Sequence, residues 1–176
     1  YCASSVSLPV GLAATGTAVF NGRVYLVGGF TTGDEIYYVS MNADGSVGTF
    51  ANVDLSTIGA PNILAYAYAY ARANPASAGS VPGNLYILGG CTAASVGCSG
   101  YSDSVVKCDI NTAGAPSGCT ESGQVQMQNI FVGATNCGTG LGAMVGTVYA
   151  NYVYLMGGLT PNCTDLKSTR YAKFDN

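Results

Sequence analysis

Histidine and tryptophan are absent from this 176-residue chain, and charged residues make up only 9% of it. Without histidine there is no Ser-His-Asp or Cys-His arrangement and no imidazole general base, the commonest acid-base group in enzymes. A charged fraction this far below the roughly 25% of an average soluble domain leaves the surface to Ser, Thr, Asn, Gly and Tyr. Such a surface is typical of an extracellular or assembled protein, so we expect an extracellular or cell-surface location.

Basic residues are also scarce. Six Lys and Arg stand against nine Asp and Glu, and the net charge is -3, so the chain lacks the clustered positive charge on which nucleic-acid binding rests. We interpret the one basic cluster, Lys167, Arg170 and Lys173, as solvated side chains. No run of 18 apolar residues occurs, so no membrane-spanning segment is expected. The sequence indicates neither a metal site nor a cofactor.

A short apolar run that contains tyrosine and ends in two glycines occurs three times. The doublets are Gly28-Gly29, Gly89-Gly90 and Gly157-Gly158, and they lie 61 and 68 residues apart. Self-similarity of this kind is the signature of a repeat architecture. A glycine pair in a strand pattern marks a close backbone approach or a kink. We therefore expect each doublet to lie near a crowded central axis.

Strand signals surround each doublet. Asn21-Gly22 tolerates the positive φ of a two-residue hairpin, and residues 146–151 form a similar segment before the third doublet. In the first repeat a third strand is predicted from Glu35 to Met41, followed by a turn and a fourth strand at 47–50. In the second repeat the third strand is predicted at 104–110 and is followed by a long turn over 111–118. In the third repeat the third strand is predicted at 168–174. No window of the sequence shows sustained helical periodicity, so we predict an all-β fold.

The residues at this point resemble kelch repeats of the bacterial secreted type. The resemblance rests on the tyrosine-containing run that ends in Gly-Gly, on the hairpin before it and on the segment from Asn42 to Phe50. It implies a kelch-like β-propeller of about three four-stranded blades, as part of a larger propeller. The implied domains are an outer strand of a preceding or closing blade at 1–6, blade 1 at 7–58, blade 2 at 59–126 and blade 3 at 127–176, which lacks its fourth strand. The chain departs from the family in lacking tryptophan and in having repeats longer than ~50 residues.

Seven cysteines point to disulfides, because no Cys-x-x-Cys spacing and no histidine are present to form zinc or thioredoxin-like sites. Proximity along the chain suggests the pairs Cys91 with Cys98, Cys108 with Cys119, and Cys137 with Cys163. Cys2 is then unpaired or inter-chain. By blade position Cys2 resembles Cys119, which suggests a chain cut from something longer. Alternatively, residues 1–6 complete blade 3, and a second copy closes a six-bladed ring; we rank the longer chain first.

Three further motifs have both functional and structural explanations. Tyr66, Tyr68 and Tyr70 alternate with alanine and are predicted to share one strand face, where they stack sugars, anchor a protein or, as we favour, pack against the next blade. Asn162 begins the one N-glycosylation motif. Residues 42–46 superficially resemble a calcium loop, but Val53 stands where the bidentate glutamate is needed. We therefore predict a turn with Gly45 at positive φ.

Two functional classes follow. The first is a non-enzymatic binding or adhesion module that recognises a glycan or a protein through loops on one rim. The second is a structural subunit of an extracellular filament or surface assembly, favoured by the low charge and the spare cysteine. A glycan-active enzyme is the least favoured alternative. A sialidase-type site needs clustered arginines, whereas Arg23, Arg72 and Arg170 lie at unrelated blade positions, and the kelch-type copper oxidases need histidine ligands.

Overall fold

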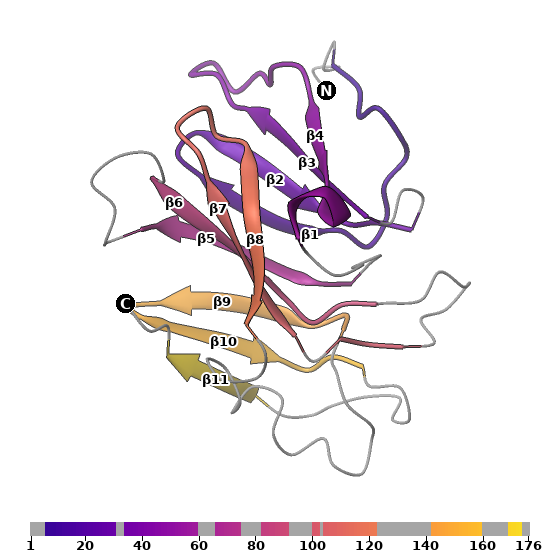
Figure 1. Ribbon diagram of the computed structural model, residues 1–176, viewed down its shortest axis with the longest axis vertical. Helices are drawn as coiled ribbons and strands as arrows, with labels where there is room; N and C mark the ends of the chain where they lie inside the picture. Colours follow the sequence, from indigo (N-terminus) through magenta and orange to yellow (C-terminus); the bar gives the residue numbers. More distant parts are fainter. Residues whose placement is uncertain are drawn as a thin grey trace.

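The computed structural model describes residues 6–30, 34–59, 66–74, 82–91, 100–102, 104–122, 142–159 and 169–173. These ranges form three antiparallel sheets and one turn of 3₁₀-helix, and they contain no α-helix. The all-β prediction is therefore confirmed for this part of the chain. The sheets follow one another from the top to the bottom of Figure 1 in the order of the sequence.

The first sheet has the strand order β1-β2-β3-β4. Its strands are β1 (Gly16–Phe20), β2 (Arg23–Val27), β3 (Glu35–Ser40) and β4 (Ala51–Asp54). The predicted hairpin turn is present, since Asn21 and Gly22 have φ of 46° and 71°. After β4, Asp54 caps the 3₁₀-helix η1 (Leu55–Ile58) by accepting a hydrogen bond from the Ser56 amide at 2.8 Å.

The second sheet repeats this order, and three strands of the third sheet are described. The second sheet contains β5 (Tyr68–Ala73), β6 (Gly83–Leu88), β7 (Val105–Ile110) and β8 (Pro116–Ser122). The third contains β9 (Val145–Tyr149), β10 (Tyr152–Met156) and β11 (Thr169–Lys173), with β10 in the middle.

The glycine doublets end the second strand of each sheet in the same conformation. Their φ values are 64° and 136° at Gly28-Gly29, 62° and 104° at Gly89-Gly90, and 67° and 109° at Gly157-Gly158. A side chain is disfavoured at such angles. Space is short as well, because a Cβ on Gly29 would lie 3.1 Å from a Leu12 methyl and one on Gly158 would lie 3.0 Å from the Gly142 carbonyl oxygen. The predicted close approach is present at Gly29 and Gly158, together with a backbone conformation that sequence reasoning did not specify.

The connection between the third and fourth strands also repeats. The Asn42 amide donates to the Ser46 carbonyl and the Gly45 amide to the Asn42 carbonyl, and Asn111, Ala115 and Gly114 form the same pair of bonds in the second sheet. Gly45 and Gly114 have φ of 82° and 80°. The segment that superficially resembles a calcium loop is thus a turn, as predicted.

Two predicted boundaries were wrong. The fourth strand of the first sheet lies at Ala51–Asp54 rather than at 47–50, because a single bridge between Met41 and Val47 closes the turn before the chain extends. In the second sheet the turn ends earlier than predicted, and β8 begins at Pro116. Gly118 therefore lies inside a strand, at a β-bulge with φ of 50°.

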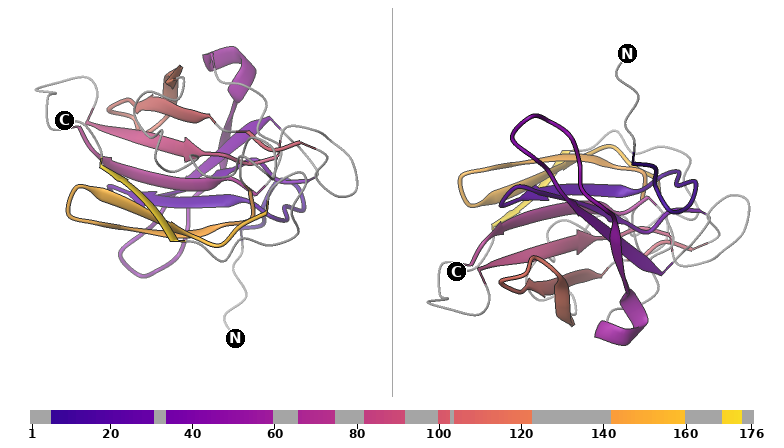
Figure 2. Two further views of the ribbon diagram at one scale, coloured as in Figure 1. Left: turned by 90° about the horizontal axis from the view of Figure 1, so that it is seen from below. Right: turned by 90° about the horizontal axis from the view of Figure 1, so that it is seen from above.

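Seen from below and from above, the sheets lie over one another (Figure 2). The hydrophobic core has two parts, one on each side of the second sheet. The part between the first and second sheets includes Tyr25, Ile36 and Ile87, all fully buried. The part between the second and third sheets includes Leu88, Val153 and Leu155. The packing between β1 and β5 is close, since a Cβ on Gly16 would lie 2.8 Å from the Ala67 carbonyl oxygen. Sheet-to-sheet burial, rather than any local element, holds the fold together.

A backbone ladder links the three sheets at the start of their first strands. Ala14, Tyr66 and Ala143 each lie two residues before β1, β5 and β9, and all have positive φ, of 59°, 59° and 54°. The Tyr66 amide donates to the Ala14 carbonyl at 2.7 Å, and the Ala143 amide donates to the Tyr66 carbonyl at 3.0 Å. One backbone hydrogen bond thus joins each repeat to the next. The three equivalent residues share both the unusual backbone angle and a place in this ladder.

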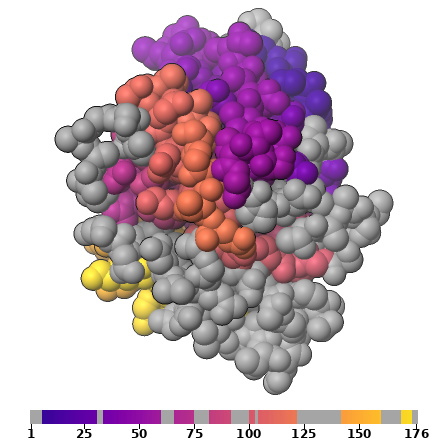
Figure 3. Space-filling view, viewed as in Figure 1, coloured from indigo at the N-terminus to yellow at the C-terminus, as the bar shows by residue number. Residues whose placement is uncertain are grey.

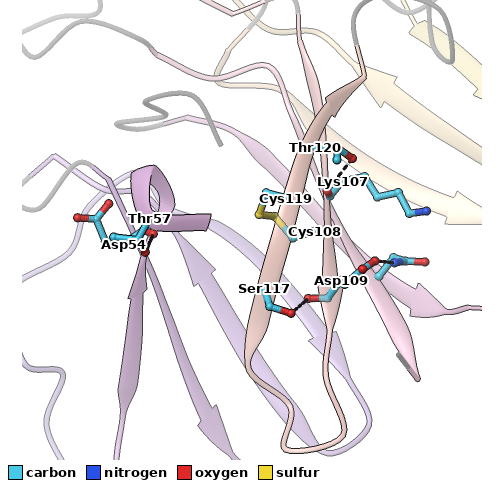
Figure 4. The surroundings of a disulfide bond; sticks show 9 residues. Asp54, Thr57, Lys107, Cys108, Asp109, Ser117, Cys119 and Thr120 are labelled. Carbon is cyan, nitrogen blue, oxygen red and sulfur yellow. Dashed lines mark hydrogen bonds between the residues drawn. A yellow bond between two sulfur atoms is a disulfide. The ribbon is translucent and has the colours of Figure 1, made fainter. Parts of the chain in front are cut away.

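The predicted disulfide between Cys108 and Cys119 is present and buried (Figure 4). The bulge in the β7–β8 pair brings the two cysteines together, because the register shifts between Lys107 and Asp109. The bond lies in the core that the first and second sheets share. In the space-filling view the β7–β8 hairpin lies beside β4 and η1 (Figure 3).

Other cysteines are less completely described. Cys91 is also disulfide-bonded, and its partner lies outside the described residues because Cys108 and Cys119 are joined to each other. Cys2, Cys98, Cys137 and Cys163 lie outside the described residues, so their predicted pairings and the inter-chain role of Cys2 stay predictions. The disulfides are consistent with an oxidising, extracellular compartment.

Candidate interaction surface

The outer face of the third sheet carries apolar and aromatic side chains in solvent. We call it the tyrosine face. In the sheet register Tyr154 lies between Thr147 on β9 and Tyr171 on β11, and Met156 lies between Val145 and Thr169. The exposed fractions are 66% for Val145, 76% for Tyr149, 41% for Met156 and 59% for Tyr171. Solvent therefore reaches a continuous set of large side chains on one side of this sheet.

Three tyrosines form a cluster within this face. The ring centroids of Tyr152, Tyr154 and Tyr171 lie 6.0 to 6.4 Å from one another. Such contacts restrain the side chains and so reduce the conformational entropy that a partner must remove on binding. Tyrosine also combines a large apolar surface with a polar hydroxyl, which explains why it is enriched in protein interfaces.

The equivalent positions in the other two sheets are buried. Val27, Leu88 and Met156 each stand immediately before a glycine doublet, and their exposed fractions are 0%, 0% and 41%. The doublet tyrosines behave similarly, since Tyr25 and Tyr86 are buried whereas Tyr154 is partly exposed. In the first two sheets a neighbouring sheet covers this face, whereas in the third it faces solvent.

A second uncovered face lies at the opposite end of the stack. Val19 on β1 is 57% exposed, whereas Ala71, its equivalent on β5, is 6% exposed. Val24 and Leu26 on β2 point to the same side as Val19 and are partly exposed. We call this surface the valine face.

The predicted tyrosine stripe does not form one face of a strand. Tyr66 precedes β5 with positive φ, and its ring packs edge-on against Phe30 at 5.0 Å. Only Tyr68 and Tyr70 share a strand face, and both pack against the second part of the core. Burial raises the pKa of the Tyr68 phenol. The structure thus places these side chains in the packing between sheets.

Several polar side chains form hydrogen bonds between sheets. The Tyr25 hydroxyl donates to the Gly114 carbonyl at 3.0 Å and joins the first sheet to the β7–β8 turn. Arg72 donates to the Asn151 side chain at 2.8 Å and joins the second sheet to the third. Burial lowers the pKa of Arg170 on β11. Arg23 lies against the β7–β8 turn, where a Cβ on Gly114 would lie 2.4 Å from its Nε.

Neither a metal site nor a membrane-spanning helix is found in the described ranges. These ranges contain no group of three or more His, Cys, Asp or Glu placed to hold a metal ion. None of their helices is long and apolar enough to cross a membrane. The glycosylation motif at Asn162 and the basic residue Lys167 fall outside the described residues.

Comparison with known proteins supports the fold alone. The structure of YjhT is similar, with a TM-score of 0.59 and 14% sequence identity, over 93% of this chain and 43% of that one. This chain therefore spans less than half the length of that protein. No family model matches the sequence, and no curated protein matches it.

Asp34 is the one described residue with a buried side-chain polar atom that lacks a hydrogen-bond partner. Burial raises the pKa of its carboxyl group, and the negative charge of Asp54 raises it further. The folded protein therefore holds this proton more tightly than the unfolded chain does. The stability that this contributes is complete below the ordinary pKa of 3.8 and is lost as the pH rises through the raised value.

We expect Asp34→Asn to stabilise the protein at pH 7 by less than about 1 kcal/mol, because the residue is only partly buried and solvent screens part of the effect. The gain should disappear at pH 3, and urea unfolding at the two pH values measures it. Asp44→Asn is the matched control of opposite sign, because hydrogen bonds from Ser46 lower the pKa of Asp44. Equal effects of Asp34→Asn at both pH values would contradict the assignment.

Proposed function

We propose that this chain is part of a kelch-like β-propeller of a secreted or cell-surface protein and acts as a non-enzymatic binding or adhesion module. Its ligand is a protein or a glycan. The observation that carries the proposal is the exposed tyrosine face, where Tyr152, Tyr154 and Tyr171 lie side by side and Tyr149 is 76% exposed. Contiguous apolar surface of this kind marks interaction sites on soluble proteins.

The propeller architecture is supported by features that recur in the repeats. The paired glycine angles occur in all three sheets, and so do the residues of positive φ before the first strands. The sheets also stack in the order of the sequence, with a core between each pair. Radial repetition of four-stranded sheets is the construction of a propeller.

Removing aromatic side chains from the tyrosine face should weaken ligand binding. We expect Tyr149→Ser and Tyr171→Ser each to reduce affinity about tenfold, as for residues at the centre of an interface. The probes are an array of immobilised oligosaccharides and a panel of purified extracellular-matrix proteins. Met41→Ser is the control, because Met41 is 40% exposed but lies directly after β3, away from the third sheet. Binding that survives both tyrosine variants would contradict the proposal.

A structural subunit of an extracellular assembly is the second candidate. It is favoured by the presence of apolar residues on two opposite faces, Val145 at 66% and Val19 at 57% exposed. Head-to-tail contacts between unlike faces generate filaments when the rotation does not close. Long polymers in electron micrographs of the purified chain would favour this function over the binding module.

A further inference from the structure

One rim of the protein brings the three repeats together. The first strand of each sheet begins beside the end of the second strand, as in the pairing of Gly16 with Val27. The glycine doublets that follow the second strands and the backbone ladder that precedes the first strands therefore lie at the same rim. We call it the doublet rim. The second repeat lies in the middle of this rim and has a described repeat on each side.

The ladder residue of the second repeat is a tyrosine, whereas its two equivalents are Ala14 and Ala143. Tyr66 has φ of 59°, which is an outlying backbone conformation for a residue with a bulky side chain. Strain of this kind is typical of binding and other functional sites, where the surrounding structure holds it in place. The ladder bonds do not require the tyrosine ring, because alanine takes part in the same ladder at the other two positions.

Two further aromatic residues lie beside Tyr66 at this rim. Phe30 directly follows the first doublet, and its ring meets the Tyr66 ring edge-on with a centroid distance of 5.0 Å. Tyr101 pairs with Cys91, which directly follows the second doublet. A Cβ on Gly142 of the third repeat would overlap the Tyr101 ring and lie 3.4 Å from the Tyr66 Cβ. We call Phe30, Tyr66 and Tyr101 the rim cluster.

The rim cluster combines an exposed apolar ring with two phenol groups. Phe30 is 44% exposed, and Tyr66 and Tyr101 are partly exposed. Burial raises the pKa of the Tyr101 phenol, and the charge of Tyr66 raises it further, so the two phenol groups lie near each other. A phenol hydroxyl both donates and accepts hydrogen bonds. The cluster thus offers a stacking surface and hydrogen-bonding groups in one place.

We infer that the rim cluster is a second binding site, separate from the tyrosine face, and that its ligand is a neutral oligosaccharide. Phe30 stacks against the C–H face of one sugar ring, and the hydroxyls of Tyr66 and Tyr101 form hydrogen bonds with the sugar hydroxyls. A sugar ring has an apolar face edged by hydroxyl groups, which is the combination that aromatic and phenol groups recognise. The inference goes beyond the proposed function, which rests on the tyrosine face, and each can fail without the other.

The size of the rim cluster favours a sugar over a protein. A specific protein interface covers about 800 Å² on each partner. A large aromatic side chain supplies roughly 150–250 Å² when it is buried completely, and the three rings of the cluster are already partly buried. The cluster is therefore too small to hold a protein partner by itself. One stacked ring and a few hydrogen bonds are sufficient for a sugar unit.

The charge of the rim cluster favours a neutral sugar. Its described contacts are with uncharged residues, Cys91 and Gly142, and none is with Lys or Arg. The chain also has a net charge of -3. An acidic sugar would lose hydration of its carboxylate at this cluster without gaining a cationic partner. We therefore expect oligosaccharides of neutral hexoses.

The experiment is isothermal titration calorimetry of the whole chain with linear hexasaccharides of glucose, mannose and galactose in turn. We expect at least one of them to bind. Phe30→Leu keeps an apolar side chain but removes the ring, and it should reduce the affinity about tenfold. Phe30→Tyr is the matched control and should change the affinity less than about twofold, because the ring remains. Tyr101→Phe removes one hydroxyl and should reduce the affinity about fivefold.

Tyr66→Asn separates a binding role from a structural one. Asparagine tolerates positive φ better than tyrosine does, so this variant relieves the backbone while it removes the ring. We expect the affinity to fall about tenfold and the melting temperature not to fall. A lower melting temperature with unchanged affinity would show that the Tyr66 ring serves packing alone and would overturn the inference.

Hexagalacturonate, which carries a carboxylate on every ring, tests the charge argument. We expect it to bind more weakly than the neutral hexasaccharide that binds best. Tighter binding of hexagalacturonate would overturn the assignment of a neutral ligand. Equal affinity of Phe30→Leu and the wild type for every hexasaccharide would overturn the site itself.

Tyr171→Ser, on the tyrosine face, separates this inference from the proposed function. If Tyr171→Ser weakens oligosaccharide binding and Phe30→Leu does not, the sugar binds the tyrosine face; the inference is then wrong and the proposed function stands. If no hexasaccharide binds but a matrix protein does, and Tyr171→Ser weakens that binding, the outcome is the same. If neither an oligosaccharide nor a matrix protein binds, both are wrong.

Discussion

Replacing Leu155 with alanine should reduce the free energy of unfolding by about 3 kcal/mol, the cost of removing a buried leucine side chain and leaving a cavity. Leu155 is 1% exposed and lies in the core between the second and third sheets. Its loss tests whether the third sheet is held by packing against the second. Equilibrium urea unfolding, followed by circular dichroism, measures the change.

Leu26→Ala is the matched control, because it is the same substitution at the same repeat position. Leu26 belongs to the valine face and is partly exposed, so we expect a loss of only about 1 kcal/mol in dilute protein. The comparison separates burial from residue type. Equal losses of unfolding free energy in the two variants would show that Leu26 is as buried as Leu155. The valine face would then not be exposed to solvent.

The disulfide between Cys108 and Cys119 should contribute about 3 kcal/mol, as expected for a bond that closes a loop of this length in the unfolded chain. The two cysteines are separated by 11 residues and are buried at 0% and 7% exposure. We expect the double variant Cys108→Ala, Cys119→Ala to lose this amount in urea unfolding. The hairpin itself should persist, because the β7–β8 ladder supplies hydrogen bonds on both sides of the bulge.

Accessibility of the sulfurs gives a second readout for the disulfide. Because the bond lies in the core between two sheets, a thiol reductant should cleave it slowly in the native protein and rapidly in urea. Mass spectrometry after alkylation follows the reaction. A double variant as stable as the wild type would contradict the predicted contribution, and rapid native-state reduction would contradict the burial.

Local chemistry explains which elements were predicted correctly. Asn21-Gly22 specifies its hairpin because both residues tolerate positive φ, and the three tyrosine-containing runs are strands because their β-branched and aromatic residues suit a pleated surface. The fourth strand of the first sheet was misplaced because the residues after the turn are equally compatible with an extended loop. Its start depends on the hydrogen bonds of β3, which the sequence alone does not display.

The candidate surface was predicted only in part. We expected tyrosines to contact any ligand, and the sequence analysis selected Tyr66, Tyr68 and Tyr70. These pack between sheets, whereas Tyr149, Tyr152, Tyr154 and Tyr171 form the exposed face. The one available signal in the sequence was the tyrosine that all three apolar runs contain. Tyr25, Tyr86 and Tyr154 have the same local sequence pattern, so this signal does not distinguish a buried tyrosine from an exposed one. Their burial differs only because two of them have a neighbouring sheet.

By itself the sequence determined that this protein is all-β, that it is built from a threefold repeat and that each repeat turns at a glycine pair. These properties depend on contacts between residues that are close in the chain. Short stretches of sequence are therefore sufficient to predict them. Tertiary structure alone decided where the repeat leaves a face uncovered, and it alone revealed the ladder through Ala14, Tyr66 and Ala143. Exposure and hydrogen bonding at those residues depend on which sheets come together in space, and equivalent residues in a repeat have different surroundings when their sheets have different neighbours.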